Sequence, residues 1–262
     1  VTFLKELNLP KERRGKATLL LSKMSIDFEN LKERVEKTGL FEEVMFGKTS
    51  EKDAKNKVAD SSYQQELDSK YKDDERILCW NIYNEPGISI GNRSISILKT
   101  LFSIVRDLDP IQPLCADIFR GISNESLVSE EEKIALELSD IISFHSYCPY
   151  DVLVEQIRYF KQFNRPIFLT EWLHRINHNN VYEIYPLLYL NNISNYCWGF
   201  VVGKTQTNEP WPHMWYEYEN GIITDFDFTK WQHDLFRPNY KPYDPNEIKI
   251  IERFNALANK DK

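Results

Sequence analysis

The chain has 262 residues, of which 42% are hydrophobic and 28% charged, and its formal net charge at pH 7 is −7. This composition is typical of a globular protein, and the length fits one large domain. No basic run is dense enough to follow a phosphate backbone, and no segment approaches the ~20 apolar residues of a membrane span. We therefore expect no nucleic-acid partner and no membrane partner.

Residues 1–72 show the weakest pattern in the chain. Short apolar runs at 16–21 and 43–46 are typical of strands, and residues 26–38 repeat apolar side chains at helical spacing. Residues 48–75 are highly charged and weakly apolar, which predicts an exposed loop or helix. Two strands are therefore identified in this part of the chain.

Beyond residue 76 the pattern becomes regular. Apolar strand-like runs alternate with amphipathic segments at steps of roughly 25 to 30 residues, which is the rhythm of parallel βα units and predicts an α/β protein. We expect strands at 77–83, 113–117, 141–147, 166–171 and 196–202. We expect helices at 95–108, 130–138, 152–163 and 182–190.

Two of these strands end in a glutamate. The first stretch is Ile77-Leu-Cys-Trp-Asn-Ile-Tyr-Asn-Glu-Pro-Gly87, and the second is Pro166-Ile-Phe-Leu-Thr-Glu171. An open doubly wound sheet has the same βα rhythm but usually carries a glycine-rich phosphate loop, which this chain lacks. Carboxylates at the ends of separate strands favour a barrel, whose active sites lie at the carboxyl ends of the strands. A structural salt bridge is the alternative interpretation of each glutamate.

Trp80-Asn-Ile-Tyr-Asn-Glu-Pro86, together with Leu169-Thr-Glu-Trp172, resembles glycoside hydrolase clan A, and within it the family 5-like cellulases, mannanases and xylanases. Trp198-Gly-Phe-Val-Val-Gly-Lys-Thr-Gln-Thr207 and Pro242-Tyr-Asp-Pro245 are similar to a bacterial cellulase- or xylanase-like subgroup. The resemblance runs from about residue 70 to about residue 254 and leaves the first 72 residues poorly matched.

This resemblance implies a single TIM (β/α)8 barrel domain over residues 1–262. It also implies that Glu85 ends strand four as the general acid/base and that Glu171 ends strand seven as the nucleophile. Strands one to three must then fit into the first 76 residues, where three full βα units normally need more. Two explanations stay open: an abbreviated front of the barrel, or a partial barrel that lacks part of the cleft wall.

The same resemblance implies a set of substrate-binding residues. Asn84 is expected to contact the sugar 2-hydroxyl, and His145 and Tyr147 to orient the nucleophile. Family relatives usually have His-Asn-Tyr where this chain has His145-Ser-Tyr147. Trp198 is expected to form the floor beneath the sugar, and Lys204, Gln206 and Trp211 to line the cleft. Alternation along the strand points Trp172 away from Glu171, so packing is as good an explanation for it as binding.

No metal site and no cofactor are expected. His174, Arg175 and His178 form a short polar loop without the spacing of metal ligands. The four cysteines have no Cys-x-x-Cys or Cys/His spacing, which favours buried free thiols. A signal peptide is absent and the chain opens at Val1, so we expect a secreted or periplasmic protein whose export signal is not in this chain.

The expected function is retaining hydrolysis of a β-linked polysaccharide or oligosaccharide such as mannan, xylan or β-glucan. Two carboxyl groups that face each other across the sugar supply the proton and the negative charge that glycosidic cleavage needs. The short front third motivates an alternative, a catalytically impaired relative that binds glycan or has a structural role. A metal-dependent isomerase on the same barrel is a third hypothesis, which the lack of clustered His and Asp ligands disfavours. The oligomeric state is left unassigned.

Overall fold

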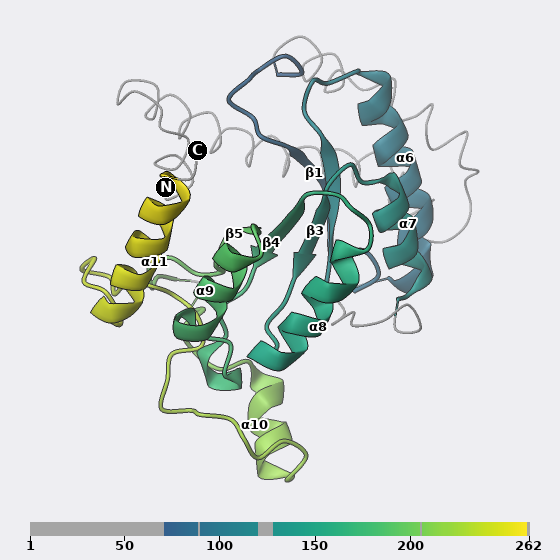
Figure 1. Ribbon diagram of the computed structural model, residues 1–262. Helices are drawn as coiled ribbons and strands as arrows, with labels where there is room; N and C mark the ends of the chain where they lie inside the picture. Colours follow the sequence, from purple (N-terminus) through teal and green to yellow (C-terminus); the bar gives the residue numbers. More distant parts are fainter. Residues whose placement is uncertain (1–70, 89, 120–127, 205, 261–262) are drawn as a thin grey trace. The chain divides into compact units, whose positions relative to one another are not determined.

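The computed structural model describes residues 71–88, 90–119, 128–204 and 206–260 (Figure 1). The elements expected at 16–21, 26–38 and 43–46 lie outside these residues. The chain divides into two compact units. Unit 1 takes its described residues from 71–115 and 130–140, and unit 2 takes its own from 116–119, 128–129 and 141–260.

Unit 1 contains β1 (Trp80–Asn84), the 3-10 helix η1 (Gly91–Arg93), α6 (Ser94–Asp107) and α7 (Glu130–Leu138). It also contains the first two residues of β2 (Leu114–Ile118). The amide of Trp80 donates a hydrogen bond of 2.9 Å to the carbonyl of Pro113, which pairs β1 with the segment that enters β2. Leu98 and Phe102 bury the apolar face of α6, which packs against α7.

Unit 2 contains the rest of β2, followed by β3 (Ile142–His145), β4 (Ile167–Glu171) and the short β5 (Ser194–Asn195). These strands pair in the order β2-β3-β4-β5, and every pair is parallel. Helix α8 (Tyr150–Lys161) connects β3 to β4, and α9 (Val181–Leu190) connects β4 to β5 (Figure 1). The 3-10 helix η3 (Arg175–Asn177) precedes α9, and α10 (Pro212–Glu219) and α11 (Pro245–Ala258) follow β5.

The core of unit 2 forms where apolar residues of α8 meet the buried strand β3. Leu153, Ile157 and Phe160 lie on one face of α8, and the Phe160 ring packs 4.6 Å from the ring of Phe144. All four residues of β3 are buried, as expected for a strand that is covered on both faces. Parallel strands joined by helices confirm the predicted α/β class, and closure into an eight-stranded barrel stays a prediction.

The strand predicted at 196–202 is wrong. Strand β5 ends at Asn195, and Val201 forms only an isolated bridge with Phe236. Gly199 adopts a left-handed conformation with φ 83°, and a Cβ atom there would lie 2.5 Å from the amide nitrogen of Asp234. The left-handed backbone at Gly199 interrupts the extended conformation that a strand needs, so the apolar composition of 196–202 does not produce a strand.

Helices α10 and α11 were not among the expected elements. Both begin with proline in the first turn, Pro212 and Pro245, where proline needs no amide hydrogen bond. The side chain of Asp244 caps α11 by accepting a hydrogen bond of 2.8 Å from the amide of Asn246. Asp-Pro at the start of an amphipathic run is therefore the sequence signal for α11.

The four cysteines are not joined in disulfide bonds, in line with the thiols that the sequence predicts, but they differ in burial. Cys115 is buried, whereas Cys79, Cys148 and Cys197 are only half-buried. Partial burial raises the pKa of the Cys148 thiol. Within the described ranges, no helix combines the length and apolar character that crossing a membrane requires.

Candidate active site

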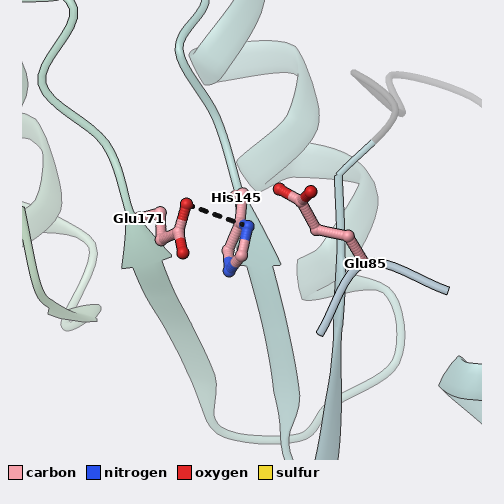
Figure 2. Close-up of side chains that lie close together, drawn as sticks. All are labelled: Glu85, His145 and Glu171. Carbon is pink, nitrogen blue, oxygen red and sulfur yellow. Dashed lines mark ion pairs between the residues drawn. The ribbon is translucent and has the colours of Figure 1, made fainter. Parts of the chain in front are cut away.

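The candidate site of unit 2 lies where β3 and β4 end side by side. His145 is the last residue of β3 and is in register with Glu171, the last residue of β4. The register shifts between Phe144 and His145, and the amide of Ser146 donates to the carbonyl of Glu171 over 3.0 Å. Nδ1 of His145 faces Oε2 of Glu171 at 3.4 Å (Figure 2). The strand ends thus place a basic ring beside a carboxylate.

Tyr147 supplies a second donor to the same carboxylate. Its hydroxyl group donates a hydrogen bond of 2.7 Å to Oε2 of Glu171. The side chain of Glu171 is 19% exposed, whereas that of His145 is 1% exposed. The carboxylate of Glu171, which solvent reaches, is therefore oriented by the buried imidazole of His145 and by the hydroxyl group of Tyr147. His145, Tyr147 and Glu171 were all expected in the site, and the structure brings them together.

Asp117 of β2 lies behind the imidazole and was missed by the sequence analysis. Its Oδ2 lies 3.4 Å from Nε2 of His145, and both side chains are almost fully buried. Its Oδ1 accepts hydrogen bonds from the hydroxyl of Thr170, over 2.8 Å, and from the hydroxyl of Ser143. A carboxylate inside the buried run Leu-Cys-Ala-Asp-Ile was the available signal, because an acidic group in such a strand needs polar partners.

Tyr147 also joins a cluster of rings that contains His174, His233 and Trp211. Their centroids lie 6.0, 5.3 and 5.4 Å from that of Tyr147, respectively. Trp211, an expected cleft residue, is the N-cap residue of α10, and its amide donates to Oε1 of Gln232 over 2.9 Å. The cluster therefore connects Trp211 to Glu171 through one side chain, Tyr147.

The two buried histidines of this cluster are neutral. Burial, reinforced by the nearby His233, lowers the pKa of His174 to about 3. Burial lowers the pKa of His233 to about 4, against the opposing effect of its hydrogen bond with the carbonyl of Leu173. The side-chain amide of Gln232 lies 2.8 Å from Nε2 of His233 and can donate to it. The cluster therefore adds no positive charge next to Tyr147 near neutral pH.

The polar loop after β4 is held in place by hydrogen bonds and an ion pair with other segments of unit 2. Arg175 forms a buried two-bond ion pair with Glu247, at 2.6 and 2.8 Å. Its guanidinium also donates to the carbonyls of His233 and Asp234. Nδ1 of His174 accepts from the amide of Asn177 over 3.2 Å. These contacts give Arg175 and His174 structural roles and fix the segment that follows Glu171 in the sequence.

The remaining expected residues of unit 2 lie on the surface of the loop after β5. Trp198 is 43% exposed, and Lys204 and Gln206 are also exposed. The amide of Trp198 donates to the carbonyl of Trp172 over 2.8 Å. Trp172 is fully buried and its indole nitrogen donates to Asn195, so packing explains it. The binding roles of Trp198, Lys204 and Gln206 stay predictions.

In unit 1, the expected acid/base residue Glu85 follows directly on β1. It is half-buried and adopts a left-handed conformation with φ 49°, while Asn84 before it is exposed. Gly87 completes the turn with φ 96°, and a Cβ atom there would overlap the buried side chain of Glu131. The turn Asn-Glu-Pro-Gly thus depends on glycine and fixes the backbone that carries Glu85, which Figure 2 also labels.

No family model and no curated protein match the chain. Among solved structures, it is similar to a beta-glucuronidase from Ruminococcus gnavus, with a TM-score of 0.48, 13% identity and 77% of this chain covered. A GH2 beta-galacturonidase from Eisenbergiella tayi matches with a TM-score of 0.48, 14% identity and 78% of this chain covered. A GH10 endo-beta-1,4-xylanase from Gloeophyllum trabeum matches with a TM-score of 0.45, 15% identity and 78% coverage.

The chain spans 36% of the length of the glucuronidase, 37% of the galacturonidase and 68% of the xylanase. These matches are glycoside hydrolases at low identity, and they do not single out family 5. Similarity at this level assigns no family to the chain.

Proposed function

We propose that this protein is a retaining β-glycoside hydrolase built on an α/β barrel, with Glu171 as nucleophile and Glu85 as general acid/base. The observation that supports this most directly is the convergence of Tyr147 and His145 on Oε2 of Glu171. A carboxylate with a hydrogen bond and a close imidazole contact on one oxygen has a fixed orientation, which a nucleophile needs in order to attack a carbon atom. The motif around Glu85, which directly follows β1, supports the second half of the pair.

In the first step, Oε1 of Glu171 attacks the anomeric carbon while the bond to the leaving oxygen breaks. Glu85 transfers its proton to that oxygen, so the leaving group departs as a neutral alcohol. The transition state resembles an oxocarbenium ion, which the negative charge of Glu171 stabilises. The product is a glycosyl ester of Glu171, and Glu85 is left as a carboxylate.

In the second step, a water molecule attacks the anomeric carbon from the side that the leaving group vacated. Glu85 accepts a proton from this water, and the ester bond to Oε1 breaks, which regenerates both glutamates in their starting forms. Two inversions at the same carbon give net retention. The hydrogen bond from Tyr147 to Oε2 favours this step, because it stabilises the carboxylate that leaves.

The substrate class that we propose is a β-linked polysaccharide or oligosaccharide. Asn84 binds the sugar 2-hydroxyl, Trp198 forms the floor beneath the sugar, and Lys204, Gln206 and Trp211 line the cleft. Trp198 is 43% exposed, so its ring is accessible for stacking on a pyranose. Because such polysaccharides occur outside cells, we also propose a secreted or periplasmic location.

The function is tested by incubating the protein with aryl β-glycosides and with β-glucan, mannan and xylan, alongside Glu171→Ala and Glu85→Gln. Glu171→Ala is expected to be inactive on every substrate. Glu85→Gln is expected to lose most activity on poor leaving groups, which need a proton, and least on activated aryl leaving groups. The anomer released first, followed by NMR, is expected to be β. A wild-type protein that hydrolyses nothing but is retained on a glycan column would support the binding alternative instead.

A further inference from the structure

We propose that Asp117 is a positioning residue that keeps His145 doubly protonated, as an imidazolium, beneath Glu171. The protonation state concerns the folded protein and holds whether or not the chain is an enzyme. Its catalytic consequence rests on the proposed function. Asp117 acts through His145 and has no contact with substrate in this scheme.

The imidazole ring lies between two carboxylates. Nε2 faces Oδ2 of Asp117 at 3.4 Å, and Nδ1 faces Oε2 of Glu171 at 3.4 Å. A neutral imidazole has one N–H and one lone pair, so one of its nitrogens would point a lone pair at a carboxylate oxygen. Only the imidazolium offers N–H to both sides.

The hydrogen bonds of Asp117 indicate that this group is an anion. Its Oδ1 accepts from the hydroxyl groups of Ser143 and Thr170. Donors directed at one carboxylate oxygen favour the ionised form of the acid. The negative charge is therefore fixed on the buried side of His145 even when Glu171 loses its own charge in the glycosyl ester.

The surroundings of His145 have opposing effects on the protonation state of its imidazole ring. Burial of its side chain, which is 1% exposed, favours the neutral ring. Asp117 on β2 and Glu171 on β4 favour the cation, and attraction between opposite charges is strong where water is excluded. Tyr147 directs its hydroxyl at Glu171 rather than at the ring, and His174 and His233 beyond it are neutral. The two carboxylates therefore oppose the effect of burial on the protonation of His145.

An imidazolium beneath Glu171 serves the second chemical step. Its N–H group at Oε2 stabilises the carboxylate that leaves when the glycosyl ester is hydrolysed. Removing the charge of Asp117 lowers the affinity of His145 for its second proton. The ester would then be hydrolysed more slowly as the pH rises.

The test is a pH titration of the imidazole nitrogens by NMR on uniformly 15N-labelled protein, with the His145 signals assigned by their loss in His145→Gln. In the wild type, both nitrogens are expected at imidazolium shifts at pH 7. In Asp117→Asn, the midpoint is expected to fall by about one to three pH units, because an adjacent opposite charge shifts a pKa by that amount. Ser143→Ala is the matched control, since it removes one hydrogen bond from Asp117 but keeps the charge, and its midpoint should move less.

Two outcomes would overturn the proposal. One is a wild-type spectrum in which a nitrogen of His145 is deprotonated at pH 7. The other is an Asp117→Asn protein, folded by its amide spectrum, in which His145 titrates at the wild-type pH. The first outcome requires only the wild type, so a variant that fails to fold leaves the proposal testable.

Kinetics distinguish this proposal from the proposed function. With an aryl β-glycoside, Asp117→Asn is expected to lower kcat and KM together, because slow ester hydrolysis lets the intermediate accumulate. Its kcat should also decline at lower pH than in the wild type. Wild-type protein that is inactive but shows the imidazolium spectrum would contradict the enzyme and leave the charge assignment intact. Active protein with a neutral His145 would contradict the charge assignment and leave the proposed enzyme intact.

Discussion

The hydroxyl group of Tyr147 and Oε2 of Glu171 are joined by a hydrogen bond of 2.7 Å, although Tyr147 follows β3 and Glu171 ends β4. The parallel pairing of these strands brings both residues to the same edge of the sheet. Since Oε2 also faces Nδ1 of His145 at 3.4 Å, the plane of the carboxylate is fixed by contacts on one of its oxygens. This relationship supports the proposal that Glu171 is a nucleophile.

Removing the Tyr147 hydroxyl should reduce activity without unfolding the protein. Tyr147→Phe keeps the ring contacts with Trp211 and His233 but loses the hydrogen bond to a charged group. We expect kcat/KM on an aryl β-glycoside to fall by about 10- to 100-fold, which is the value of such a bond. Tyr218→Phe, on the exposed face of α10, is the matched control. Equal activity of Tyr147→Phe and wild type would remove the support that this bond gives to the mechanism.

The buried ion pair between Arg175 and Glu247 should be important for stability. Arg175→Met leaves the carboxylate of Glu247 buried without its cation, and we expect a loss of about 3–5 kcal/mol in the free energy of unfolding. The exposed pair of Arg158 with Glu155 is the control, because Arg158→Met should change stability by only about 0–1 kcal/mol. Urea unfolding measures both. The double variant Arg175→Met/Glu247→Leu should recover part of the loss, and a further decrease instead would mean that the charge of Glu247 is not the cause.

Gly199 should not tolerate a side chain. Gly199→Ala combines a left-handed residue, φ 83°, with a Cβ atom placed 2.5 Å from the backbone of Asp234. Gly221 has a similar φ of 66° but open space around it. Gly221→Ala therefore measures the cost of the left-handed backbone alone, which is about 1–2 kcal/mol in the free energy of unfolding. We expect a larger loss for Gly199→Ala in thermal or urea unfolding. Equal losses would show that the segment around Asp234 moves away freely.

The neutral histidines should make the protein less stable in mild acid. The pKa values of His174 and His233 in the folded protein are about 3 and about 4, below the ordinary value of 6.5. Between those values and 6.5 the unfolded chain binds more protons, so stability is fully present above pH 6.5 and falls as the pH decreases toward 4. Each group contributes at most about 1.4 kcal/mol per pH unit.

Urea unfolding at pH 7 and pH 5 measures this dependence. His233→Gln has no proton to gain at this position, so its loss of stability between the two pH values should be smaller than that of the wild type. An exposed histidine, His178, supplies the control through His178→Gln. If all three proteins lose the same stability, protonation of His233 does not contribute to acid sensitivity.

The elements that the sequence predicted well are those set by local pattern. The predicted helix at 130–138 coincides with α7. The strand predicted at 113–117 differs from β2 by one residue at each end, and the strand predicted at 166–171 differs from β4 by one residue at its start. The spacing of apolar side chains determines such elements, and the final residue is always the least certain. The same local reading placed His145, Tyr147 and Glu171 at strand ends.

What the sequence did not predict depends on contacts between distant segments. Asp117 is identified by its partners Ser143 and Thr170, which come from two other strands. The strand expected at 196–202 is interrupted at Gly199, where φ is positive and the backbone of Asp234 lies close. Neither relationship leaves a periodic signal in the sequence. The pairing of Glu85 with Glu171 is of the same kind and stays a prediction.

The most direct test of the central claim is to trap the glycosyl ester on Glu171. The protein is incubated with activated 2-deoxy-2-fluoro β-glycosides of the gluco, manno and xylo series. Fluorine at carbon 2 slows both formation and hydrolysis of the ester, whereas the activated leaving group speeds formation alone, so the ester accumulates. Peptide mapping by mass spectrometry then locates the adduct. We expect one sugar on the peptide that contains Glu171, and none in Glu171→Ala. An adduct on any other residue, or active protein whose first product is the α-anomer, would contradict the assignment.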